Sequence, residues 1–76
     1  MPRIAPLSSQ EFEKFLLSIG CHFKRKKGSH KVYNKPGLNR PIIFPETKEI
    51  TVNVILSNLR TLKMNREEFL KKIGKS

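Results

Sequence analysis

One stretch of the chain, residues 24–33, carries the side chains best suited to chemistry. It holds five Lys or Arg residues and no acidic residue, and a Gly-Ser pair precedes its only histidine, His30. Cations at this density bind polyanions, and a nucleic-acid backbone is the obvious partner because each neutralised phosphate releases condensed counterions. Histidine is the side chain that exchanges protons near neutral pH. The stretch therefore indicates a phosphate-binding surface with one group suited to proton transfer.

Cleavage of RNA is the reaction that this combination fits. It needs a group that activates the 2′-hydroxyl, a proton for the leaving oxygen, and cations for the charge that develops on the phosphate. His30 would be the general acid or base, and no metal is needed. A lone histidine in a strand is more often structural than catalytic, so a packing role for His30 stays open. The predicted phosphate-binding residues are Lys24, Lys26, Lys27, Gly28, Ser29, Lys31, Lys35 and Arg40.

Other site chemistry is poorly supported. His22 and His30 lie eight residues apart with no carboxylate or second cysteine nearby, whereas a structural zinc site needs four ligands in closely spaced pairs. Ser29 beside His30 does not make a nucleophile and base, because neighbouring strand residues point to opposite faces. Cys21 is the only cysteine and is predicted to be a small half-buried residue. We expect no metal and no small-molecule cofactor.

Length and charge limit the class of protein. The 76 residues suffice for one domain, spanning residues 1–76, with little core left to enclose a deep pocket. The net charge is +10, and no acidic residue lies between Lys14 and Pro45. This asymmetry favours a polyanionic partner over a merely solvated surface. No apolar run approaches a membrane span, so we expect a cytoplasmic protein without membrane contact.

The pattern of apolar residues predicts the elements that position this stretch. A first helix begins at Ser8, which forms a capping box with Glu11, and stops at Gly20. Strands are predicted at 21–27, 30–34 and 40–44, with turns at Gly28-Ser29 and 35–39. Pro41 near the start of the third strand suggests an edge position or the beginning of a strand.

The predicted strand faces decide which cations are exposed. In the first strand only Phe23 is a convincing inward residue, so His22, Lys24 and Lys26 are expected to share the other face. In the second strand Val32 and Tyr33 point to opposite faces. A sheet covered by helices on one side would leave its other side wet and rich in lysine.

Two further helices follow the strands. Thr51 is the expected N-cap of the second helix, which ends near Lys63, and Asn65 opens a short third helix that ends at Gly74. The element order is helix, three antiparallel strands, helix, short helix. The sequence therefore predicts an α+β fold.

The chain resembles the HicA family of small toxins over nearly its whole length. The resemblance rests on the order and spacing of short motifs: Gly20, Gly28-Ser29-His30, Pro45, Ile50-Thr51-Val52, Ile55-Leu56 and Glu67-Glu68-Phe69-Leu70. It implies a double-stranded-RNA-binding-domain-like fold and an endoribonuclease (mRNA interferase) whose catalytic histidine falls on His30. It also implies two partners, mRNA and a HicB-like antitoxin of a type II toxin–antitoxin pair.

The chain departs from the family pattern at two places. Many members carry a second histidine where this chain has Lys31, and another soon after the strand-three proline, where this chain has Glu46-Thr47-Lys48. The second change replaces an active-site neighbour and bears on activity more than on fold. Two alternatives to the nuclease stay open: a non-catalytic RNA-binding module of the same fold, and a domain whose basic face meets an acidic protein.

Overall fold

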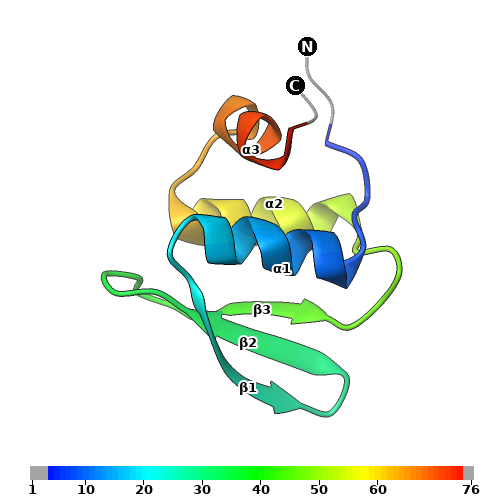
Figure 1. Cartoon of the computed structure of the whole chain (residues 1–76), viewed down its shortest axis with the longest axis vertical. Coiled ribbons are helices and arrows are strands. Elements are labelled where there is room, and N and C mark those ends of the chain that lie inside the picture. Colours follow the sequence, from blue (N-terminus) through cyan, green and yellow to red (C-terminus); the bar gives the residue numbers. More distant parts are fainter. Residues whose placement is uncertain (1–3, 75–76) are drawn as a thin grey trace.

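A computed structural model describes residues 4–74 of the protein. Its elements are α1 (Ser9–Ser18), β1 (His22–Lys27), β2 (His30–Asn34), β3 (Ile42–Pro45), α2 (Val52–Leu62) and α3 (Arg66–Ile73). The strands form one antiparallel sheet in the order β1-β2-β3. Figure 1 shows α1 and α2 over one face of this sheet and α3 beyond them. The predicted α+β, double-stranded-RNA-binding-domain-like order is confirmed.

Each helix begins and ends where its capping residues predict. The Ser8 hydroxyl accepts a hydrogen bond from the Glu11 amide, and Thr51 and Asn65 cap α2 and α3 in the same way. Gly20 and Gly74 adopt the left-handed conformation expected after a helix. These confirmed caps fix the lengths of the helices that cover the sheet.

The core lies between the sheet and the helices. Fourteen apolar side chains are buried there or nearby, and aromatic rings link the layers. Phe44 of β3 meets Phe12 of α1 edge-on at 5.0 Å, and Phe15 meets Phe69 of α3 at 4.7 Å. These two ring contacts therefore connect the sheet with α1, and α1 with α3. We call the helix-covered side of the sheet the inner face and the other side the outer face.

A β-bulge at Lys24 changes the predicted faces of β1. Phe23 pairs with Tyr33, but Arg25 pairs with Val32 and Lys26 with Lys31, so one residue of β1 has no partner. Directly opposed residues share a face, and Tyr33 belongs to the inner face. Lys26 therefore lies on the same side as Phe23, and the prediction that it shares the opposite face is wrong. The extra residue shifts the alternation of side chains by one position.

Smaller corrections concern β3 and Cys21. β3 begins at Ile42 rather than at residue 40, because Pro41 cannot donate to the ladder. Its position at the sheet edge is confirmed, and the Asn58 side chain of α2 donates a hydrogen bond to the Ile43 carbonyl on that edge. Cys21 is fully buried rather than half-buried, and burial raises the pKa of its thiol.

Candidate nucleic-acid interface

His30 stands at the first position of β2 with its side chain exposed to solvent. Its neighbours across the ladder are Lys27 on β1 and Pro45 on β3, so these three share the outer face. The left-handed Gly28 (φ 60°) makes the tight turn that brings β1 back alongside β2. A backbone hydrogen bond of 2.7 Å from the Glu46 amide to the Ser29 carbonyl ties this turn to the end of β3. His30 is therefore an exposed imidazole on a well-anchored turn.

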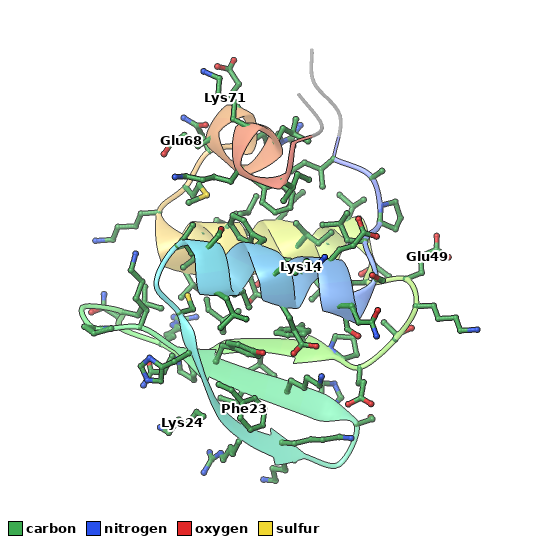
Figure 2. The ribbon with its side chains drawn as sticks, in the orientation of Figure 1. Lys14, Phe23, Lys24, Glu49, Glu68 and Lys71 are labelled. Carbon is green, nitrogen blue, oxygen red and sulfur yellow. The ribbon has the colours of Figure 1, made fainter. Side chains whose placement is uncertain are left out.

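Three cations of β1 are exposed and form no ion pair within residues 4–74: Lys24, Arg25 and Lys27. Arg25 and Lys27 lie on the outer face by their pairing with Val32 and His30. Figure 2 shows Lys24 at the rim of β1, on the side of the molecule far from α3. We call these three the free cations. Arg25 and Lys27 give the outer face an uncompensated positive charge, and Lys27 lies beside His30.

The outer face also carries an apolar strip. Val32 follows His30 by two residues on that face and is only 5% exposed, although it lies outside the main core cluster. Its ladder partner Ile43 is 47% exposed. Apolar surface beside cations suits a nucleic acid, because bases offer flat apolar faces while phosphates meet the charges.

Two other predicted lysines lie on the inner side and are engaged by carboxylates. The Lys31 ammonium lies 2.6 Å from a Glu13 oxygen and 3.9 Å from Glu46, and Lys26 lies 2.9 Å from Glu46. The Tyr33 hydroxyl donates to the second Glu13 oxygen at 2.7 Å. We call Glu13, Lys26, Lys31, Tyr33 and Glu46 the inner network. Its lysines hold protein carboxylates rather than presenting free charge.

The inner network shifts the ionisation of its members. Burial pushes the pKa of Glu13 upward, but hydrogen bonds from Lys31 and Tyr33 outweigh it and hold that pKa below its usual value. The hydrogen bond to Glu13 raises the pKa of Lys31. The hydrogen bond from Lys26 lowers the pKa of Glu46. Burial, with the bond to Glu13, raises the pKa of Tyr33. At neutral pH these shifts keep both carboxylates ionised, Lys31 charged and Tyr33 neutral.

The remaining predicted residues lie apart from His30. Lys35 and Arg40 flank the β2–β3 turn, at the opposite end of that hairpin from the Gly28-Ser29 turn. The structure thus places Lys27, Gly28 and Ser29 beside His30, puts Lys24 further along β1 at the bulge, and separates Lys26, Lys31, Lys35 and Arg40 from His30. Sequence reasoning missed Arg25, whose place on the outer face depends on the bulge, and the carboxylates that neutralise the inner lysines.

Residues 4–74 offer no site of two other kinds. They contain no group of three or more His, Cys, Asp or Glu side chains placed to hold a metal ion. None of the described helices is long and apolar enough to cross a membrane.

The sequence matches the family described as "HicA toxin of bacterial toxin-antitoxin" over residues 9–64, which is more than half of the chain. The chain belongs to the HicA toxin family. The match runs from the start of α1 to just past α2, so it includes the sheet and His30. No curated protein and no solved structure gives a match. The chain is accordingly a toxin component of a toxin–antitoxin system, as the resemblance implied.

Proposed function

We propose that this HicA-family chain is a metal-independent endoribonuclease that cleaves mRNA in the cytoplasm, with His30 as its general base. The observation that carries the proposal is the exposed imidazole of His30 on the outer face, next to Lys27 and with Arg25 further along the same face. A histidine that only packed would be covered by other side chains. This one faces solvent on a positively charged, partly apolar surface.

The reaction follows from the groups on this surface. Neutral His30 takes the proton of a 2′-hydroxyl, and the 2′-oxygen attacks the adjacent phosphorus. The bond from phosphorus to the 5′-oxygen breaks, which leaves a 2′,3′-cyclic phosphate. The leaving 5′-oxygen takes a proton from water to become a 5′-hydroxyl, and the imidazolium of His30 returns its proton to the solvent. Lys27, as the cross-strand neighbour of His30, is the cation best placed to meet the negative charge on the phosphate and the leaving oxygen. Lys24 and Arg25 hold neighbouring phosphates, with Gly28 and Ser29 shaping the turn.

The inner network does not take part in the chemistry. Lys26 and Lys31 were predicted to bind phosphate, but each ammonium lies within ion-pair distance of a carboxylate. Glu46, at one of the positions where many family members carry histidine, is held ionised by Lys26 and cannot donate a proton. The proposal therefore rests on His30 alone.

Cleavage of a labelled transcript by the purified protein tests the proposal. We expect cleavage of RNA but not of DNA of matching sequence, because DNA lacks the 2′-hydroxyl, and we expect EDTA to have no effect. His30→Ala should lower the cleavage rate by about a hundredfold or more, the usual contribution of a general acid or base. The protein should still fold, since His30 is exposed and lies outside the core cluster.

His22→Ala is the matched control, because His22 is another exposed histidine and pairs with Asn34 on the same sheet. It should cleave like the unchanged protein. Near-normal cleavage by a folded His30→Ala protein would remove His30 from the mechanism. RNA binding without any cleavage by the unchanged protein would instead support the non-catalytic RNA-binding module.

We further propose that the cognate partner, a HicB-like antitoxin, covers His30 with an acidic surface. The free cations would speed association with such a surface and fix its orientation. Co-expression should relieve the growth arrest that the toxin causes. In the complex, diethyl pyrocarbonate should modify His30 more slowly than in the free protein; an unchanged rate at His30 within a stable complex would rule out occlusion.

A further inference from the structure

A second cationic site lies at the other end of the β2–β3 hairpin. A shallow pocket of about 360 Å³ is lined by Asn39, Arg40, Ser57, Arg60, Thr61 and Lys63. Three of these six side chains are cationic and none is acidic. A smaller hollow of about 210 Å³ adjoins it through Asn39, Thr61 and Lys63 and reaches Lys35. Figure 1 shows the β2–β3 turn and the C-terminal end of α2 at the same end of the molecule.

The charges of this pocket are not used within the protein. In the part of the chain that the structure describes, Arg40, Arg60 and Lys63 form no ion pair. The C-terminal end of a helix carries partial negative charge, and one basic residue in the last turn would complement it. The β2–β3 turn and the end of α2 together supply three cations, which is more than the end of the helix requires. The excess is suited to a ligand with strong negative charge.

The polar side chains of the pocket fit the oxygens of a phosphate. The Ser57 hydroxyl and the Asn39 amide have no hydrogen-bond partner within residues 4–74, and the Thr61 hydroxyl makes only a long 3.4 Å bond to the Ser57 carbonyl. Hydroxyl and amide donors beside Arg and Lys side chains are the groups that bind phosphate oxygens. Charge and donors therefore point to the same ligand.

The backbone of Lys63 is unusual in a way that concerns this pocket. Lys63 has φ 56° and ψ 41°, and it is the one non-glycine residue of the described chain with a positive φ. Glycine is the usual residue at this position after a helix, because a Cβ is unfavourable there. Lysine in its place supplies a charge to the pocket that glycine could not.

We propose that the pocket of Arg40, Arg60 and Lys63 is a second phosphate-binding site for RNA. This inference rests on the proposed function and deepens it, because it extends the RNA path beyond His30. His30 and the turn are separated by the length of β2, about 13 Å at about 3.3 Å per residue. The same path covers about four stacked nucleotides at 3.4 Å each. The strand bound at His30 would run along the outer face past Ile43 and turn round the β3 edge, which places a backbone phosphate in the pocket beside α2.

Binding of non-cleavable RNA tests this site separately from cleavage. The probes are 2′-O-methyl oligonucleotides of about 2 and about 12 nucleotides, which lack the attacking hydroxyl. Arg60→Gln/Lys63→Gly removes two charges from the pocket. Lys71→Gln/Lys72→Gln removes the same charge from the exposed surface of α3, which Figure 2 shows beyond the helical layer.

We expect the pocket variant to bind the longer probe at least about fivefold more weakly than the control variant, with a log–log salt slope shallower by about 0.7. The short probe, which reaches only one site, should bind both variants alike. Because Lys63→Gly relieves an unfavourable backbone conformation, the pocket variant should melt no lower than the unchanged protein. Weaker binding from a more stable protein could not be a folding defect.

Three results would overturn the inference. Equal affinity of the pocket and control variants for the longer probe, while the unchanged protein binds and cleaves RNA, would overturn the second site alone. A pocket variant that binds RNA normally but loses affinity for a poly-glutamate peptide would make the pocket a protein-docking site. An unchanged protein that binds neither probe would overturn the proposed function together with this site.

Discussion

The lysines of the inner network and the free cations of β1 are the same kind of residue in the same strands, yet the structure gives them different surroundings. Lys31 and Lys26 meet Glu13 and Glu46 on the inner side. Lys27 is their near neighbour in sequence and lies on the outer face with no carboxylate partner among residues 4–74. The two strands therefore carry two sets of cations, one paired with carboxylates of the protein and one to which we assign RNA binding in the proposed function.

The difference between paired and unpaired cations follows from the register of β1 against β2 and from the small number of acidic residues. The chain has only six acidic residues, and both carboxylates of the inner network lie on segments that border the inner face. The bulge at Lys24 decides which β1 cations reach that side. A count of basic residues therefore overestimates the unpaired positive charge of the strands, and the pairing of each lysine has to be known.

The largest expected effect comes from breaking the inner network at its centre. Glu13→Gln removes the carboxylate that accepts from both Lys31 and Tyr33. Because the contact is partly exposed and screened by water, we expect a modest fall in Tm, roughly 5 °C for a domain of this size. Thermal unfolding followed by circular dichroism measures it. Glu49→Gln, at an exposed position outside the helices, is the matched control and should leave Tm unchanged; equal shifts in both variants would contradict the role of the network.

The pH dependence of Tm tests the same contribution of Glu13 to stability. The folded-state pKa of Glu13 lies below its usual value of 4.5, so its contribution is complete above that pH and is lost as pH falls through the lowered pKa. Glu46 acts in the same direction. Tm should therefore decline below about pH 4.5. Glu13→Gln should decline less steeply there, and parallel curves for the two proteins would show that Glu13 is not responsible.

A smaller effect is expected from a substitution that releases a lysine of the inner network from its carboxylate and so adds it to the free cations. Glu46→Gln removes the acceptor of Lys26, which is half exposed and would then be free to meet a phosphate. RNA affinity should rise severalfold, with a salt slope steeper by about 0.7 if one phosphate contact is gained. Glu49→Gln removes the same charge from an exposed position nearby without releasing a lysine. An equal rise in both variants would mean that net charge alone is responsible.

Most of the fold could be predicted because it depends on local signals. The caps at Ser8, Thr51 and Asn65 and the left-handed Gly20 are set by side chains a few residues away. The bulge could not be predicted, since nothing in a run of four consecutive cations distinguishes Lys24 from Lys26. The mistaken face of Lys26 follows directly from it.

The position of His30 in the candidate site could be predicted from the sequence. The partners of the lysines around it could not. His30 follows a turn whose glycine requires a positive φ, so its place at a strand start was visible in the sequence. The partners of Lys31 were not, because Glu13 lies 18 residues away on α1 and only the packing of α1 on the sheet brings them together. The pocket of Arg40, Arg60 and Lys63 likewise joins a turn to a distant helix.

The most direct test of the two sets is to measure stability and RNA affinity together for Lys27→Gln and Lys31→Gln. We predict that Lys27→Gln keeps Tm but weakens binding of the 2′-O-methyl probe of about 12 nucleotides. The log–log salt slope of that binding should become shallower by about 0.7. Lys31→Gln should lower Tm, because Glu13 loses its cation, and should leave the salt slope unchanged. If Lys31→Gln weakens RNA binding as much as Lys27→Gln while Tm stays constant, the separation of structural and RNA-binding cations is wrong.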